Sequence, residues 1–191
     1  MKPTAVIAAL ILASAIFGLA ACGGSDSESG AGTPSGEAFD RAFIDAMVPH
    51  HEAALEMARA AKEAGLTEPE LEKIANDILA TQQAEIDQMK QWRGEWFGSS
   101  EIDPNGAAAL GLSESDMGMQ HGAEGFADST QVDTDFAQMM ITHHNGAIAM
   151  ARLADDKAEH DELKDLAGAI ISAQEREIEV MSPHASGMNH G

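Results

Sequence analysis

The amino-acid sequence predicts an all-α protein, a four-helix bundle formed by two duplicated helical hairpins. Three observations support this fold class. Two blocks of the sequence recur 92 to 93 residues downstream, and apolar residues inside them recur every three or four positions. The 191-residue chain also has no tyrosine and only 4% aromatic residues. That composition disfavours sheets, because strands draw on aromatic and β-branched residues.

The first hairpin covers residues 38–97. Its first helix carries an apolar stripe with steps of four and three residues, formed by Phe43, Met47, His50, Ala54, Met57 and Ala61. Pro49 lies inside this stripe, so the helix either bends there or begins again at Pro49. We interpret Thr67-Glu-Pro-Glu70 as a capping box that opens the second helix. We expect that helix to end at Gly94.

The second hairpin covers residues 132–182 and repeats the first. Residues 133–152 match residues 40–59 at nine of twenty positions, and residues 163–181 match residues 71–89 at seven of nineteen. The repeat predicts helices over residues 136–154 and 163–181, closed by Ser182-Pro183. Because neither hairpin can bury its own apolar stripe, the two should pack together. Residues 98–131 then form a long and partly disordered crossover.

The N-terminus is typical of an exported lipoprotein. Residues 1–21 combine Lys2 with an apolar run that is too short to span a membrane, as in a signal peptide. The run ends in Leu19-Ala-Ala-Cys22, which resembles a bacterial lipobox and implies cleavage before Cys22 and lipid attachment to its sulfur. Residues 22–37 are a flexible tether rich in Gly and Ser. We therefore expect the protein to be exported and anchored to the outer face of the cell membrane.

Charge and cysteine content exclude several classes of function. The formal net charge is −21, which repels nucleic-acid phosphates and anionic lipid head groups and favours cationic partners such as metal ions. The single cysteine rules out a disulfide scaffold and a cysteine-rich metal site. We expect no nucleic-acid partner, and membrane contact through the lipid alone.

Two adjacent histidines recur in the apolar stripe of both repeats. An antiparallel register places each doublet level with a glutamine and a glutamate on the neighbouring helix, and one turn after a methionine. The candidate metal ligands of this layer are His50, His51, Glu85, His143, His144, Glu177, Met47 and Met140. Gln82 and Gln174 lie beside them. Thioether selects Cu(I), whereas imidazole binds both Cu(I) and Cu(II), so this donor set favours copper.

Other interpretations of the same residues remain open. The methionines also fit plain core packing, and the histidines also fit a hydrogen-bonded core network with the glutamines and glutamates. Glu85 and Glu177 could bind a metal or only orient the imidazoles. His160, beside a turn and flanked by acids, is most simply a helix-end residue. The chain contains no Glu-x-x-His or His-Glu-x-x-His motif, so we predict no enzymatic activity, with metal-dependent redox chemistry as the weaker alternative.

Two short clusters outside the predicted helices combine methionine and histidine. Met117, Met119 and His121 lie in the crossover, and His184, Met188 and His190 lie in the tail, residues 183–191. The methionines of these segments have no predicted core to fill. We therefore interpret both clusters as flexible arms that collect copper.

The doublets carry a resemblance to a known bacterial family. Met47-Val-Pro-His50-His51 and Met140-Ile-Thr-His143-His144 are each followed by Ala-x-x-Met-Ala. Over residues 39–182 the chain resembles the exported proteins called domain of unknown function 305. The resemblance implies a ferritin-like four-helix bundle and an extracytoplasmic location. It also implies copper binding at both histidine doublets, Met47 and Met140, as in the CopM-type relatives.

Two hypotheses follow from the sequence. The first is a lipid-anchored copper-binding protein that sequesters the metal or hands it on. The alternative is a helical interaction module in which the histidines, glutamines and glutamates form a structural network without metal.

Overall fold

A computed structural model describes residues 33–186 of the chain. Four long helices form the body of this part: α1 (Glu37–Ala64), α2 (Pro69–Phe97), α4 (Val132–Ala151) and α6 (Asp161–Met181). Four short elements connect or follow them: α3 (Gly106–Ala109), η1 (Ala123–Phe126), α5 (Ala154–Lys157) and η2 (His184–Ser186). The described residues contain no strand.

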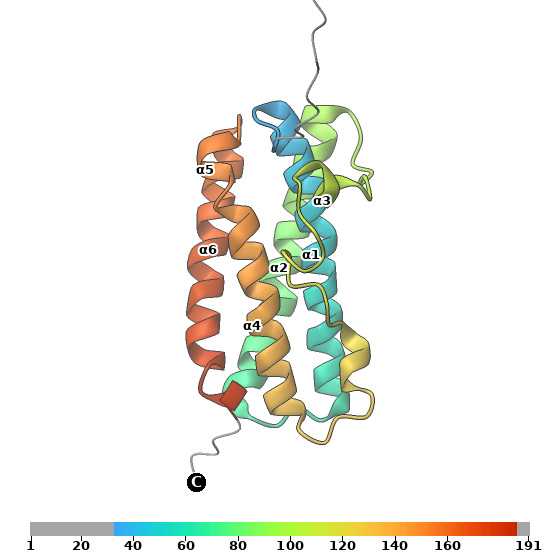
Figure 1. Cartoon of the computed structure of the whole chain (residues 1–191), viewed down its shortest axis with the longest axis vertical. Coiled ribbons are helices and arrows are strands. Elements are labelled where there is room, and N and C mark those ends of the chain that lie inside the picture. The colour runs from blue at the N-terminus through green and yellow to red at the C-terminus, as the bar shows by residue number, and fades with distance from the viewer. Residues whose placement is uncertain (1–32, 187–191) are drawn as a thin grey trace, which may run out of the picture. The chain divides into compact units, whose positions relative to one another are not determined.

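The long helices pack as two hairpins. Helix α1 contacts α2, α4 contacts α6, and the hairpins meet where α1 contacts α4 and α2 contacts α6 (Figure 1). The predicted all-α fold of two helical hairpins is therefore confirmed. None of the helices in the described range is both long and apolar enough for a membrane crossing. The predictions for the signal peptide, Cys22, most of the tether, Met188 and His190 fall outside the described residues.

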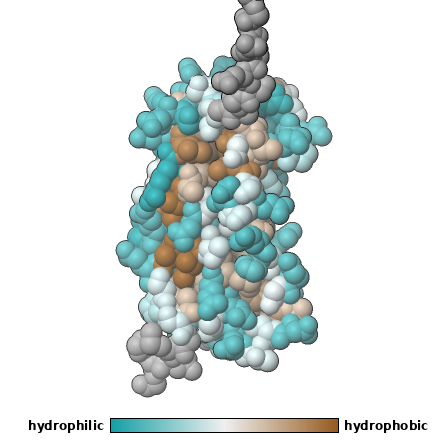
Figure 2. Space-filling model, in the orientation of Figure 1, coloured by the Kyte–Doolittle hydropathy of each residue, from teal (hydrophilic) through white to brown (hydrophobic). Residues whose placement is uncertain are grey.

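The apolar stripes predicted from periodicity line the interior of the bundle. Fully buried side chains from both hairpins fill it, among them Phe43, Met47, Ile78, Phe136 and Met140. The face drawn in Figure 2 is mainly hydrophilic, with apolar patches between the polar groups. In the described range, Val180 is the one large apolar side chain that is exposed. This distribution is what the amphipathic pattern of the four helices requires.

The N-terminus of α2 is capped by the other hairpin. No side chain of its own caps this helix. The Asp133 carboxylate of α4 instead accepts hydrogen bonds from the backbone N–H groups of Thr67 (2.9 Å) and Glu68 (3.0 Å) and from the Thr67 hydroxyl (2.9 Å). The predicted capping box is therefore wrong, because a carboxylate from a neighbouring helix satisfies the exposed donors.

The equivalent contact closes the opposite end of the bundle. Asp40 of α1, which aligns with Asp133 in the repeat, accepts hydrogen bonds from the backbone N–H groups of Glu159 and His160, each at 3.0 Å. Its carboxylate also contacts the Nδ1 of His160 at 2.6 Å. His160 is thus a helix-end residue, as predicted. Each hairpin caps a helix of the other, which holds the hairpins together.

Three predictions of helix bounds need correction. The helix predicted over residues 136–154 is α4, which runs from Val132 to Ala151, and Ala154 begins the separate helix α5. Helix α2 does not end at Gly94 but continues to Phe97, and Gly98 follows with a φ of 78°. The left-handed conformation that favours glycine therefore falls four residues later than expected. Helix α1 runs without interruption through Pro49, so it does not begin again there.

Candidate metal centre in the bundle interior

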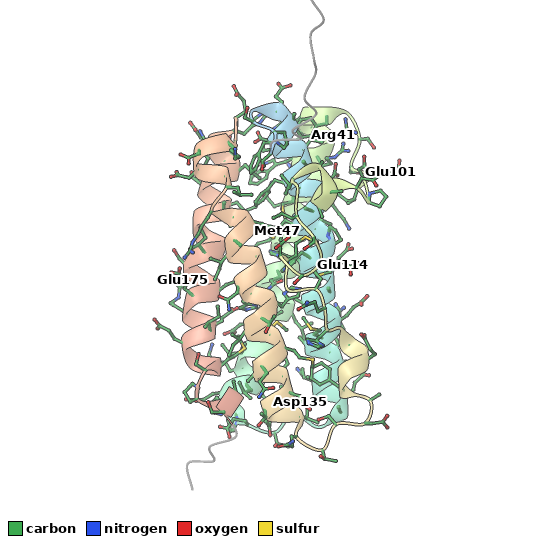
Figure 3. The ribbon with its side chains drawn as sticks, viewed as in Figure 1. Arg41, Met47, Glu101, Glu114, Asp135 and Glu175 are labelled. Carbon is green, nitrogen blue, oxygen red and sulfur yellow. The ribbon has the colours of Figure 1, made fainter. Side chains whose placement is uncertain are left out.

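The four repeated histidines lie in the middle of α1 and α4 and are almost completely buried. His50 and His143 are 1% exposed, and His51 and His144 are 0% exposed. Figure 3 labels Met47, which lies on α1 one turn before the doublet and is also fully buried. The predicted inward orientation of both doublets is confirmed.

The second histidine of each doublet binds a glutamate of the neighbouring helix. His51 Nε2 lies 2.8 Å from Glu85 Oε2, and His144 Nε2 lies 2.6 Å from Glu177 Oε2. These pairs confirm the predicted register. An ionised carboxylate can only accept a hydrogen bond, so Nε2 carries a proton, and the neutral form of each ring then has its free lone pair on Nδ1. Each glutamate thereby orients an imidazole with its Nδ1 available as a ligand.

The first histidines of the two doublets meet where the hairpins pack. The ring centroids of His50 and His143 are 3.7 Å apart, with an angle of 34° between the planes. His50 Nε2 donates a hydrogen bond to the backbone carbonyl of Met117 at 2.8 Å. The His50 Nδ1 therefore also keeps its lone pair. His143 has no such partner: both of its ring nitrogens are buried without a hydrogen bond.

Burial keeps this pair of rings neutral. It lowers the pKa of His50 to about 3, and the repulsion between the protonated forms of His50 and His51 is the next cause. Burial also lowers the pKa of His143 well below its usual value, and the repulsion that its protonated form would meet from a protonated His50 is the next cause. A neutral imidazole is the form that binds a metal, so these two rings need not lose a proton before they ligate.

Several buried polar atoms in this layer lack any hydrogen-bond partner. In the described residues they are His50 Nδ1, His51 Nδ1, both ring nitrogens of His143, His144 Nδ1, Gln82 Oε1 and Gln174 Oε1. Buried polar groups are nearly always paired, because an unpaired one costs about 1–3 kcal/mol. A neutral His143 ring keeps a proton on one nitrogen, so six of these seven atoms can offer a lone pair at one time, and one cation could satisfy several of them. The residues therefore fit a metal ion.

The geometry limits what kind of metal site is possible. The described part of the chain does not bring three imidazole or carboxylate ligand atoms of this layer within 4.8 Å of one another. A three-ligand site here therefore needs a methionine sulfur, a glutamine oxygen or a movement of the rings. Met47 and Met140 are both fully buried in the same layer of the core, and their thioethers suit Cu(I).

The crossover covers the layer instead of forming a flexible arm. Met117 is only 7% exposed and belongs to the hydrophobic core, so the prediction that it has no core to fill is wrong. Glycine makes this contact possible: a Cβ on Gly146 of α4 would lie 1.9 Å from the Met117 carbonyl oxygen. Gly118, with a φ of 67°, approaches the Thr142 carbonyl in the same way.

The other predicted ligands lie apart from this layer. Met119 is half-buried against the core, and His121 is exposed. His184 lies at the end of the bundle, where its Nε2 is 3.0 Å from Glu70 Oε2. Sequence reasoning missed the contact between the crossover and His50. One signal for it was present, because Gly146 replaces the Ala53 of the first repeat.

Comparison with known proteins agrees with this architecture. The family model described as "Domain of unknown function (DUF305)" matches residues 40–184. The chain belongs to this family. The matched range extends from the Asp40 cap to His184, so it includes both histidine doublets of this DUF305 protein. Among curated proteins no sequence matches significantly.

Solved structures include relatives with the same fold. CopM in its Cu(I)-bound form is 30% identical, with a TM-score of 0.66, over 78% of this chain and 97% of CopM. CopM in its Cu(II)-bound form is 32% identical with the same TM-score, over 78% and 96% of the two chains. A DUF305 protein from Streptomyces coelicolor is 27% identical with a TM-score of 0.65, over 74% of this chain and 88% of that one.

Proposed function

We propose that this DUF305 protein binds copper in its buried histidine layer, outside the cytoplasm, and sequesters the metal or hands it on without catalysing a reaction. The unpartnered ring nitrogens of the two doublets carry the proposal. The copper-bound structures of CopM support the choice of metal. The lipobox-like sequence that ends in Cys22 supports export and lipid anchoring.

The four histidines divide into two roles. His51 and His144 are held by Glu85 and Glu177, which act by fixing the ring orientation and raising ligand basicity rather than by binding the metal. His50 and His143 meet between the hairpins and are the central pair. His143 is the most open to ligation because neither of its nitrogens is engaged.

The thioethers make the layer soft enough for Cu(I). Met47 and Met140 occupy equivalent positions in the two repeats, one turn before the doublets, and both are fully buried. Sulfur and neutral imidazole together favour copper over hard cations such as Mg²⁺. The buried layer would also shield bound copper from water.

Measurement of Cu(I) affinity by competition with a chromogenic chelator tests the proposal. We expect His143→Ala to weaken binding by at least about tenfold, as loss of a supporting or ligating group does in other metal sites. The control is His121→Ala, which removes an exposed imidazole of the crossover and should leave the affinity unchanged.

Two results would overturn the proposal. One is wild-type binding no tighter than millimolar. The other is a His143→Ala variant that binds copper like the wild type but unfolds at a lower temperature, which would assign the histidines to a structural network. A copper-soaked crystal with anomalous scattering at the copper edge would locate the metal directly.

A further inference from the structure

A second group of ligand atoms lies at one end of the bundle, far from the histidine layer. The carboxylates of Glu68 and Glu70 and the imidazole of His184 each place one ligand atom within 4.8 Å of the other two. The first two residues stand at the start of α2, and the third belongs to η2 after α6. Glu68 is 17 residues from Glu85, or about 25 Å along an α-helix.

The histidine is brought to the two acids by the fold. The Gln138 side chain of α4 donates a hydrogen bond to the Ala185 carbonyl at 2.7 Å, which anchors η2. His184 Nε2 then lies 3.0 Å from Glu70 Oε2, and the His184 side chain is only 20% exposed. Acids in the first turn of a helix are ordinary partners of its dipole. That preference does not explain why an imidazole from a distant segment joins them.

The opposite end of the bundle provides an internal comparison. The 92-residue offset of the second repeated block, extended beyond its ends, places Glu68 opposite His160, Glu70 opposite Glu162, and Trp92 opposite His184. At that end the Nδ1 of His160 contacts Asp40, and its ring stacks on Trp96 with centroids 3.8 Å apart. One end of the duplicated fold is thus closed by an aromatic stack, whereas the other presents two carboxylates and an imidazole.

Local charge also favours a cation. Asp133 of α4 lies at the same end of the bundle as Glu68 and Glu70, and its carboxylate accepts a hydrogen bond from the Glu68 backbone N–H at 3.0 Å. One imidazole cannot balance three carboxylates, even when it is protonated. The net negative charge of this end would therefore attract a divalent cation.

We propose that Glu68, Glu70 and His184 form a surface site for a divalent metal of borderline softness, Zn(II) or Cu(II). One nitrogen and two carboxylate oxygens are ligands that both ions accept. Three protein ligands leave further positions for water, as in an open site. The absence of sulfur separates this site from the thioether-containing interior layer, which favours Cu(I). The proposal of this surface site does not depend on the function proposed for the interior layer.

Isothermal titration of the purified full-length chain with Zn(II) alone tests the site. We expect His184→Ala and Glu70→Gln each to lower the affinity for one equivalent of Zn(II) by at least about tenfold. The matched control is Glu162→Gln, which changes the equivalent acid at the opposite end and should leave that equivalent intact. The Cu(II)-loaded protein should show the electron paramagnetic resonance signature of a single nitrogen ligand, and His184→Ala should abolish it.

The two proposals fail in different ways. His143→Ala should retain this equivalent of Zn(II) even though it weakens Cu(I) binding. If His143→Ala removes the zinc equivalent and His184→Ala keeps it, zinc binds in the interior and the surface site is refuted. The surface site is equally refuted if the wild type binds Zn(II) no tighter than millimolar, or if Glu162→Gln weakens binding as much as Glu70→Gln.

Discussion

In the two repeats the second histidine of the doublet has the same kind of hydrogen-bond partner, whereas the first histidine does not. His51 and His144 have matching glutamate partners, at 2.8 and 2.6 Å. His50, in contrast, donates to the Met117 carbonyl, whereas His143 has no hydrogen bond. The crossover creates this difference because it can lie on only one side of the layer. Duplication therefore supplied the same ligand atoms in both repeats. The crossover between the repeats engages His50 and leaves His143 more available to a ligand.

The repeats also differ in how they attach the ends of their hairpins. In the first, the guanidinium of Arg93 donates to the carboxylate of Asp45 from Nε at 3.0 Å and from Nη2 at 3.3 Å, and both side chains are 3% exposed. The equivalent residues of the second repeat are Gln138 and Ala185, joined by a neutral hydrogen bond. The buried ion pair of the first repeat is thus replaced in the second repeat by a hydrogen bond between neutral groups.

The largest effect should come from breaking that ion pair. Asp45→Ala leaves Arg93 buried without its carboxylate, so we expect a loss of about 3–5 kcal/mol in the free energy of unfolding. Gln138→Ala removes one exposed neutral hydrogen bond and should cost about 1 kcal/mol or less. Urea denaturation of both variants measures the difference. Equal losses would contradict the asymmetry between the repeats.

The next effect concerns the contact that distinguishes His50 from His143. In Gly146→Ala the new Cβ would meet the Met117 carbonyl at 1.9 Å, so the crossover must shift, at a cost of about 3 kcal/mol. Gly168→Ala on α6 is the matched control, since a Cβ there meets nothing within 4 Å. It should be neutral or stabilising, because alanine is the better helix former. Thermal denaturation of the two variants compares them; a Gly146→Ala protein as stable as wild type would refute the close packing of the crossover.

A smaller effect should appear on acidification. Burial lowers the pKa of His50 to about 3 and that of His143 well below its usual value. The unfolded chain therefore binds more protons than the folded one below pH 6.5. Stability is complete above that pH and falls as the pH decreases toward the folded pKa, by about 1.4 kcal/mol per unit for one histidine.

Chemical denaturation at a series of pH values checks this sign. Between pH 6.5 and 5, one such histidine should cost the wild type about 2 kcal/mol. His50→Gln and His143→Gln should each make the free energy of unfolding depend less on pH. Comparison of the two slopes shows whether the contact with Met117 changes the pH response of His50. A wild-type profile that does not change over this range would contradict the burial of the neutral pair.

The residues of the interior layer were predictable because their positions follow from helical periodicity and from the turn between adjacent helices. The steps of three and four residues from Met47 to His50 and Ala54 place these side chains on one face of a helix, and the turn near residue 66 sets which residues of the next helix lie level with them. The pairs His51–Glu85 and His144–Glu177 follow directly. The end of α2 was less predictable, since Gly94 and Gly98 both offer a stop and only packing selects between them.

Contacts between distant segments could not be derived in this way. No periodic pattern links Asp133 to Thr67 or Asp40 to His160, and the capping box offered a plausible local partner that the structure does not use. The burial of Met117 depended on the path of the crossover. That path depends on two close approaches between the crossover and α4, at Gly146 and at Gly118.

By itself, the sequence determined the duplicated helices, their buried faces and the inward doublets of imidazole, since helical periodicity and antiparallel register depend on neighbours along the chain. The tertiary structure decided which ring nitrogens remain unpaired, which carboxylate caps which helix, and which end of the bundle gathers Glu68, Glu70 and His184. These features arise only when segments far apart in the chain meet, and their partners are selected by shape and hydrogen bonding rather than by spacing in the sequence.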